Sequence, residues 1–356
     1  MITKFQGKRI SSLLGILPET VSNFDDEADN YAFPIRQTMR LKKIMGYHQH
    51  RLAKETSTVS DFAVFGLQYM LNNHWITREE IGAVVVVTLC PDHFVPHISN
   101  IVQAECDLNT DVICMDIAQG CCGFLLGLMQ SFMLLDHLGD KKVVLINGDV
   151  LSHKVSKRDR NDFPLIGDAA SITIIENSTD AGPVYYEMHM DGKRGNALKI
   201  PAGGFRMPST EQTAVMTDQG DGNYRSLDNM HMDGSEVFNF VQTEVPPMLQ
   251  SAFEREGKSV EDFDYFFFHQ PNCFMLQKLA EKAHLPKEKL PMNLVENYGN
   301  SSGASIPITA ILNAREDLIS RNNRCCLAAF GSGLAWGAVF MDIGDLEHCE
   351  LIASTL

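Results

Sequence analysis

The positions of apolar residues along the chain predict buried strands that alternate with helices. Residues 82–89 are an almost unbroken valine run, and residues 141–151 and 168–175 are similar apolar runs. Continuous runs of this length are typical of strands in a sheet that helices cover on both sides. Residues 57–72 instead carry apolar side chains at helical spacing. The first half of the chain therefore predicts a doubly wound α/β layer.

Residues 123–138 form an apolar stretch of another kind, because nearly every position is apolar whichever way it faces. This stretch predicts a helix inside the protein, with Gly139 as its stop. The helix begins directly after Cys121 and Cys122, where a strand is predicted to end. A helix N-terminus favours the thiolate over the thiol, so this pair is placed for nucleophilic chemistry. The alternative is that both cysteines are small buried hydrophobes.

The second half of the chain repeats the order of elements found in the first half. A polar, glycine-rich stretch at about 177–222 separates the two, so we predict two units, residues 1–176 and residues 177–356. A duplicated α/β unit brings equivalent helix starts face to face near a pseudo-twofold axis. The matching segments are 84–91 with 265–271, 112–121 with 292–300, and 142–150 with 324–332.

In this register Cys121, His269 and Asn300 each stand at the end of a predicted buried strand. Open α/β sheets bind their ligands at that edge. A histidine after an aromatic strand and an asparagine in a Tyr-Gly-Asn turn are each more often structural. Their occurrence together at equivalent ends of a repeat favours a common site.

Composition excludes several other classes of function. The net charge of -15 argues against nucleic acid as the main partner. No stretch reaches the roughly 18 apolar residues of a membrane span, and no secretory start is present, so we expect a cytoplasmic protein. The nine cysteines are odd in number and lack zinc-type CxxC pairs, which favours reduced thiols. We expect no metal site.

Four motifs stand in order along the chain, within residues 116–124, 269–272, 298–302 and 330–337. They resemble the nucleophile motif, the His-Gln-x-Asn motif, the Gly-Asn-(Ser/Thr)-Ser turn and the C-terminal glycine loop of the β-ketoacyl-acyl-carrier-protein synthase III family of the thiolase superfamily. Residues 167–170 also fit. The resemblance implies a thiolase-like α/β fold of two duplicated doubly wound halves in a five-layer α-β-α-β-α arrangement. The N-terminal half would carry the nucleophilic cysteine, and the C-terminal half the histidine and the asparagine.

The resemblance also implies decarboxylative Claisen condensation, in which Cys121 holds an acyl primer as a thioester. A malonyl thioester then loses carbon dioxide, and His269 and Asn300 donate hydrogen bonds to the enolate oxygen. The backbone N–H groups of Cys121 and Ser332 would meet the second oxyanion. The product is a β-ketoacyl thioester of fatty acid or related secondary metabolite synthesis. We expect no tightly bound cofactor, since coenzyme A or the phosphopantetheine of an acyl carrier protein arrives with the substrate.

The chain departs from the family where an aromatic residue and two arginines clamp coenzyme A. Arg40, Ile44 and Phe274 stand at the aligned positions, and only Arg160 matches the family. Residues 36–51 and the loop at 152–162 are instead rich in basic residues, which suits an acidic carrier protein. The alternative is that these basic residues only face water. The residues that the sequence assigns to substrate or carrier binding are Arg40, Lys43, Arg160, Asn272 and Phe274.

The family is also expected to form a homodimer, in which Phe94 or Val95 would line the acyl pocket across the subunit boundary. Two other functions stay open. One is an acyltransferase that moves the acyl group from Cys121 to an oxygen or nitrogen nucleophile without releasing carbon dioxide. The other is a non-catalytic subunit that pairs with a true synthase. A complete Cys-His-Asn set argues against the second alternative.

Overall fold

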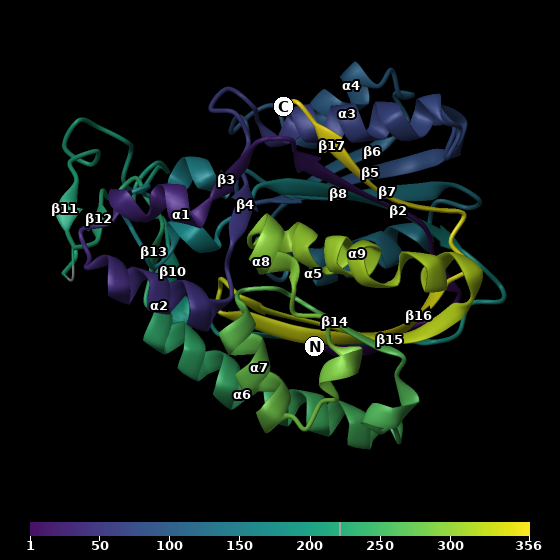
Figure 1. Ribbon diagram of the computed structural model, residues 1–356. Helices are drawn as coiled ribbons and strands as arrows, with labels where there is room; N and C mark the ends of the chain where they lie inside the picture. Colours follow the sequence, from purple (N-terminus) through teal and green to yellow (C-terminus); the bar gives the residue numbers. More distant parts are fainter. Residues whose placement is uncertain (221) are drawn as a thin grey trace.

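The computed structural model describes residues 1–220 and 222–356, so Asp221, within the polar stretch predicted at 177–222, lies outside the described residues. Two mixed sheets stack with helices between and outside them (Figure 1). The first sheet has the order β17-β2-β8-β7-β5-β6, and the second has the order β1-β9-β16-β15-β14. The strands of the first sheet are β17 (His348–Ser354), β2 (Lys8–Pro18), β8 (Ala169–Asn177), β7 (Lys142–Asp149), β5 (Ile81–Thr88) and β6 (Ile113–Ala118). Those of the second are β1 (Ile2–Phe5), β9 (Val184–Met190), β16 (Ala335–Gly344), β15 (Asn322–Gly331) and β14 (Tyr265–Phe268).

Helices complete a five-layer arrangement, which confirms the expected thiolase-like fold. Between the sheets lie α5 (Gly123–Leu135) and α9 (Ser305–Ser320), each in contact with strands of both sheets. The first sheet is covered outside by α3 (Val59–Asn72) and α4 (Ile98–Glu105), and the second by α6 (Gly234–Glu256) and α7 (Cys273–Lys282) (Figure 1). All eight residues of β5 are buried, as the valine run predicts for a strand covered on both faces.

The two sheets share one topology over four strands. In each, a central strand (β8 or β16) runs antiparallel to both of its neighbours, and a parallel pair follows (β7 with β5, β15 with β14). The chain ends cross between the halves, because β1 pairs with β9 and β17 pairs with β2. Each end of the chain thus extends the sheet that the other half builds.

The predicted strand at residues 292–300 is wrong, because this segment forms the helix α8 (Leu294–Tyr298). The first sheet ends in β6, whereas the second sheet ends in β14 without an equivalent strand. Leu294, Val295 and Tyr298 have the i, i+1, i+4 spacing of one helix face, and the first two are buried. Local periodicity therefore prevails over the register of the repeat.

Two further expectations need correction. Helix α5 ends at Leu135 and not at residue 138, because the Asn177 amide donates to the Leu135 carbonyl at 2.9 Å. Gly139 follows with φ +60°, four residues beyond the helix. The stretch predicted as polar at 177–222 also contains β9, whose first five residues are buried. Because aromatic and charged residues interrupt the apolar pattern of β9, hydrophobicity alone does not predict this strand.

The remaining elements surround one end of the two halves. They are β3 (Val21–Asn23), α1 (Phe24–Glu27), α2 (Ile35–Met45), β4 (Gln49–Arg51), β10 (Leu198–Lys199), β11 (Thr217–Asp218), β12 (Tyr224–Arg225) and β13 (His231–Met232).

No helix among the described residues has the length and apolar character needed to cross a bilayer.

Candidate active site

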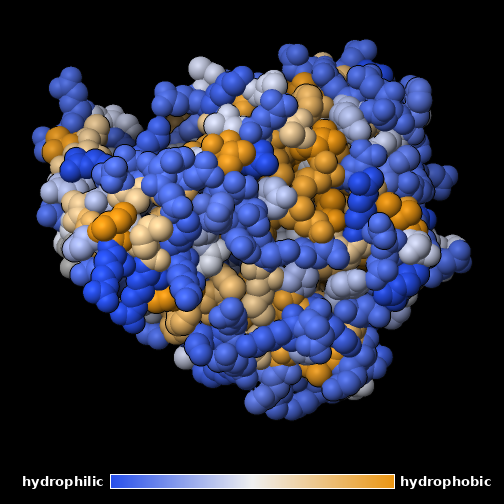
Figure 2. Space-filling model, in the orientation of Figure 1, coloured by the Kyte–Doolittle hydropathy of each residue, from blue (hydrophilic) through white to orange (hydrophobic). Residues whose placement is uncertain are grey.

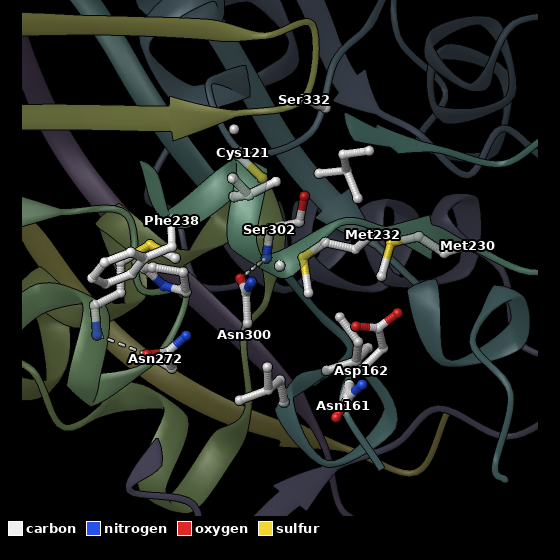
Figure 3. Close-up of a pocket in the computed structure, with 18 of the residues that line it drawn as sticks. Cys121, Asn161, Asp162, Met230, Met232, Phe238, Asn272, Asn300, Ser302 and Ser332 are labelled. Atoms are coloured by element: carbon white, nitrogen blue, oxygen red, sulfur yellow. Dashed lines mark hydrogen bonds between the residues drawn. The ribbon is translucent and has the colours of Figure 1, made fainter. Parts of the chain in front are cut away.

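A cavity of about 760 Å³ brings the predicted residues of the two halves together. Cys121 comes from the first half, and His269, Asn300 and Ser332 come from the second; all four line this one cavity. Figure 3 shows Cys121, Asn300 and Ser332 in it. Most of its other lining side chains are apolar, including the flexible Met45, Met230, Met232 and Met275 and the aromatic Phe238, Phe274 and Phe330. The arrangement offers a few polar groups in an apolar chamber, which is typical of a ligand site.

Cys121 lies in the turn between β6 and α5, where the backbone of the second half packs against its thiol. A Cβ atom at Gly331 would stand 2.4 Å from the Cys121 Cβ and 2.5 Å from its Sγ. Only a residue without a side chain permits this approach. The next residue, Ser332, directs its backbone N–H toward the thiol, as does Cys121 itself. Two donors are therefore available at the sulfur.

Burial raises the pKa of the Cys121 thiol to about 11, while the N–H groups of Ser332 and Cys121 lower it in part, and the Asp149 carboxylate raises it further. The sequence predicts the opposite direction, because a helix N-terminus favours a thiolate. That prediction is wrong for the resting site, since the loss of hydration outweighs the two N–H donors. The thiol is neutral at pH 7.

Cys122 has a different environment from its neighbour. Its side chain is buried, and its thiol donates to the Ala335 carbonyl at 3.3 Å, away from the cavity. Burial also raises its pKa well above the usual range. Cys122 thus joins α5 to β16 of the other half and is a packing residue.

His269 follows β14 and is held on two sides. Its backbone N–H donates to the Ala328 carbonyl of β15 at 2.8 Å, and its Nδ1 lies 2.8 Å from the Ser305 hydroxyl. Burial lowers the pKa of His269 to about 4, although the Ser302 carbonyl opposes this shift. The imidazole is therefore neutral at pH 7. When Nδ1 accepts the Ser305 hydroxyl hydrogen, the neutral ring carries its one hydrogen on Nε2, and Nε2 is then the donor for a ligand.

Asn300 is oriented through both its side chain and its backbone. Its Oδ1 accepts the Ser302 N–H at 2.9 Å (Figure 3). That contact assigns the amide oxygen, so Nδ2 is left as the donor for the cavity. The preceding Gly299 has φ +80°, and a Cβ there would stand 2.6 Å from the Gly167 backbone. Asn300 follows the helix α8 and not a strand, but its side chain still lies at the predicted site.

The structure separates the predicted carrier-binding residues into two groups. Asn272 and Phe274 line the cavity, and the Asn272 Oδ1 also accepts the Met275 N–H at 2.8 Å as the cap of α7. Arg40 and Lys43 are exposed on α2 and do not line the cavity. The Arg160 guanidinium lies 3.2 Å from the centre of the Phe33 ring, also outside the cavity lining.

Phe94 and Val95 lie on the surface of the chain, with 64% and 78% of their area exposed. Phe94 contacts the ring of Phe205, whose centre is 5.0 Å away, and neither Phe94 nor Val95 lines the cavity. A single chain therefore does not bring them to the acyl site.

Sequence reasoning missed the polar partners of the site and one half of its apolar wall. Ser302, the last residue of the Gly-Asn motif, orients Asn300, and Ser305, three residues beyond the motif, orients His269. Met230 and Met232 enter the cavity from the segment just before α6, which follows the stretch between the two repeats (Figure 3). Their position after a repeat boundary carries no local signal of a binding site. Among the residues that the structure describes, no three His, Cys, Asp or Glu side chains gather as a metal site.

The two stacked sheets and the cysteine-containing cavity between the halves are those of the thiolase-like fold class. Residues 115–192 match the family described as 3-oxoacyl-[acyl-carrier-protein (ACP)] synthase III, and residues 253–343 match its C-terminal region. The β-ketoacyl-[acyl-carrier-protein] synthase III of Natranaerobius thermophilus is 31% identical over 298 residues, which cover 82% of this chain and 87% of the relative. That of Limosilactobacillus reuteri is 28% identical and covers 92% of this chain and 95% of its own. The chain belongs to the 3-oxoacyl-[acyl-carrier-protein] synthase III family.

A solved structure supports the same assignment at the level of the fold. The 3-oxoacyl-(acyl-carrier protein) synthase from Burkholderia xenovorans LB400 superimposes with a TM-score of 0.91, at 28% identity and over 99% of both chains. The duplicated sheets, the central helices and the chain ends therefore follow an arrangement shared with this relative.

Proposed function

We propose that this protein condenses an acyl primer, held as a thioester on Cys121, with a malonyl thioester. The observation that carries this proposal is the convergence of the Cys121 thiol, the His269 imidazole and the Asn300 amide on one apolar cavity. The product would be a β-ketoacyl thioester for fatty acid or related secondary metabolite synthesis. The names of the relatives above point to a carrier-protein thioester as one substrate.

The first half-reaction transfers the acyl group to the cysteine. The Cys121 thiol loses its proton, its sulfur attacks the thioester carbonyl, and the carrier thiol leaves with a proton. The tetrahedral intermediate carries a negative oxygen, and we assign its stabilisation to the N–H groups of Cys121 and Ser332, which already act on the Cys121 sulfur. Sulfur suits this step because it is both a nucleophile and a leaving group.

The second half-reaction forms the new carbon–carbon bond. The malonyl carboxylate leaves as carbon dioxide, and its electron pair becomes an enolate. In this proposal the neutral His269 and the Asn300 Nδ2 donate hydrogen bonds to the enolate oxygen, and the neutral state of His269 and the orientation of the Asn300 amide support these roles. The enolate carbon attacks the acyl group on Cys121, and the collapse of the intermediate releases the cysteine sulfur, which regains a proton.

Helix α2 supports an acidic carrier protein as the donor of these thioesters. Its Leu41 and Met45 line the cavity, while Arg36, Arg40 and Lys43 are exposed on the same helix. Figure 2 shows strongly hydrophilic and hydrophobic side chains next to each other at the left of the view, where α2 lies in Figure 1. The exposed apolar residues of α2 are Ile35, Met39 and Ile44. A mixed basic and apolar surface beside the cavity suits an acidic partner.

A homodimer is the assembly that we propose. The strand β6 is the edge of the six-stranded sheet, and its Ile113 is 41% exposed. An unpaired apolar edge strand is a template for pairing with another chain. Phe94 and Val95, which follow the neighbouring strand β5, are also exposed. A second copy would give these two residues the pocket contact that one chain lacks.

The proposal is tested by intact-protein mass spectrometry after incubation with a panel of acyl thioesters. We expect a mass increase equal to one acyl group, which disappears when a malonyl thioester is added, together with release of carbon dioxide. Transfer of the acyl group to an oxygen or nitrogen acceptor without carbon dioxide would support the acyltransferase. The absence of any acyl adduct with every thioester would support the non-catalytic subunit.

A further inference from the structure

His50 and Glu27, which are far in sequence from Cys121, His269 and Asn300, form a buried pair. His50 lies on β4 with 1% of its area exposed, and Glu27 ends α1 with 6% exposed. The His50 Nε2 lies 2.7 Å from the Glu27 Oε1, and its Nδ1 lies 2.5 Å from the Ile166 carbonyl oxygen. His50 belongs to the basic stretch that the sequence places on a carrier-binding surface. It is instead an interior residue.

These contacts require one shared proton between the two side chains. The Ile166 carbonyl can only accept, so the His50 Nδ1 must carry a hydrogen and donate it. In a neutral imidazole the other nitrogen, Nε2, then has no hydrogen. A Glu27 carboxylate also has none, so two acceptors would face each other at 2.7 Å. The pair is bonded when either His50 or Glu27 carries one additional proton.

The Ile166 carbonyl belongs to a short extended segment that holds Asn300 on its other side. The Asn300 N–H donates to the Leu165 carbonyl at 2.6 Å, and the Asn300 carbonyl accepts the Gly167 N–H at 3.1 Å. In an extended segment successive carbonyls point to opposite sides. The Leu165 carbonyl therefore meets Asn300, while the next carbonyl, that of Ile166, meets His50.

The strand β4, which carries His50, also contacts the backbone around Asn300. The Arg51 carbonyl of β4 accepts the Asp168 N–H at 2.8 Å. Just before β4, the His48 N–H donates to the Glu296 carbonyl of the helix α8 at 2.9 Å. Asn300 lies between these two supports. The side chain of His50 is the part of this support that a substitution can remove without changing the backbone.

We propose that His50, held by a proton shared with Glu27, is a positioning residue for Asn300. It fixes the Ile166 peptide and, through the residues 165–167, the backbone from which the Asn300 amide reaches the cavity. This inference rests on the proposed function, because it assumes that Asn300 assists the decarboxylation of the malonyl thioester. It adds a residue that touches neither substrate nor the reacting atoms.

Two substitutions separate the two ring nitrogens of His50. An asparagine amide can occupy the place of Nδ1, whereas a glutamine amide reaches the place of Nε2. We expect His50→Gln to lose the Ile166 contact and to lower malonyl decarboxylation by about 10- to 100-fold, the scale of a misplaced catalytic group. His50→Asn keeps a donor for Ile166, so its decarboxylation should stay within about threefold of the unmodified protein on the same scale.

Glu27→Gln provides the rescue that a structural role would not predict. The glutamine amide supplies the hydrogen that the shared proton supplies in the native pair, so a neutral His50 can accept it at Nε2 and still donate from Nδ1. We expect decarboxylation within about threefold of the native rate. Glu27→Leu leaves Nδ1 able to donate to Ile166 but removes the partner that holds Nε2, so its decarboxylation should fall between those of the native protein and His50→Gln. His48→Gln, at an exposed side chain two residues earlier, is the matched control and should change nothing.

Each variant is measured in two half-reactions, acyl loading of Cys121 and carbon dioxide release from malonyl-carrier thioester. Loading reports that the variant is folded, since Cys121 stands on other elements. A selective loss of decarboxylation in His50→Gln, with retention in His50→Asn, supports the proposal. Equal loss in both half-reactions, or equal rates in the two His50 variants, overturns it. Asn300→Ala is measured alongside, because its failure to lower decarboxylation would refute the proposed function itself and not only the role of His50.

Discussion

The Cys121 thiol lies against the backbone of Gly331, so closely that a Cβ atom on residue 331 would stand 2.5 Å from the sulfur. This contact joins the turn before α5 in one half to the end of β15 in the other. It also places the N–H group of the next residue, Ser332, at the sulfur. The nucleophile and one of its hydrogen-bond donors are thus set by the meeting of the two halves.

Gly331→Ala should therefore disturb the nucleophile directly. The added methyl group must move the Cys121 side chain or the strand end, and we expect acyl loading to fall by about 10- to 100-fold. Loading is measured as the rate of acyl adduct formation by intact-protein mass. Gly192→Ala is the control, since an added Cβ there meets nothing within 4 Å. Unchanged loading in Gly331→Ala would show that the sulfur reacts from another position.

The acyl group should reside on Cys121 and not on Cys122. Only the first of these thiols lines the cavity, while the second donates to the Ala335 carbonyl. Peptide mapping after loading should find the label on Cys121 and none in Cys121→Ala. We expect Cys122→Ala to keep the label and to lose about 1 kcal/mol of stability, a usual cost for one core substitution. A label that survives in Cys121→Ala and vanishes in Cys122→Ala would reverse the assignment.

Loading and decarboxylation should respond differently to the loss of the side-chain donors. We expect His269→Ala and Asn300→Ala to keep much of the acyl transfer to Cys121, while malonyl decarboxylation falls by about 100-fold or more, as for one oxyanion donor. The two rates are measured by acyl adduct formation and by carbon dioxide release. If both half-reactions proceed at the native rate, these residues are structural and the condensing mechanism fails.

The two half-reactions should also differ in their dependence on pH. Burial raises the pKa of the Cys121 thiol to about 11, so the thiol is protonated at pH 7 and its thiolate fraction grows as the pH rises. Alkylation of Cys121 by iodoacetamide, followed by peptide mass, should accelerate about tenfold for each pH unit between about pH 7 and 10. A plateau that begins below pH 9 would contradict the raised pKa.

Decarboxylation should instead be insensitive to pH in the neutral range. Burial lowers the pKa of His269 to about 4, so the imidazole gains a proton only when the pH falls toward that value. Above it the ring stays neutral, and the donor set for the enolate does not change. Carbon dioxide release from malonyl thioester by Cys121→Ala, which cannot be acylated, measures this step. A strong change between pH 6 and 8 would show that another group titrates in the site.

The basic surface of α2 should determine the preference for the carrier. We expect the double substitution of Arg40→Glu and Lys43→Glu to raise the KM for carrier-protein thioesters and to leave kcat largely unchanged, because binding is lost equally from ground and transition states. Higher salt should have a similar effect in the native protein, since exposed charges are screened within about 8 Å at physiological ionic strength.

A matched pair of reversals, Lys193→Glu with Lys258→Glu, changes the net charge by the same amount at exposed positions away from α2. It should not alter the KM. Equal efficiency with coenzyme A and carrier-protein thioesters, independent of salt, would refute the carrier preference. It would then favour coenzyme A as the donor of the primer.

Much of the fold could be predicted from local pattern because covered strands record their burial in every residue. The valine run of β5 and the all-apolar character of α5 each require a covering layer, whatever their position in the chain. The register of the repeat failed at α8, because it predicts a strand at 292–300 where the local spacing of apolar residues is that of a helix face. Among the described residues the second sheet ends in β14, and whether a sheet continues past such a strand is a property of the assembled sheet.

The sequence by itself determined that Cys121, His269 and Asn300 would meet in one cavity, because they stand in ordered motifs at matching places of a repeat. Only the tertiary structure decided their chemical state. The thiol pKa, the Ser305 contact of His269 and the support of Asn300 by His50 all depend on segments distant in sequence. A local pattern reports that a side chain is covered, whereas hydration and hydrogen bonding depend on which groups cover it. The groups that surround these three side chains are set by the packing of the two halves against each other.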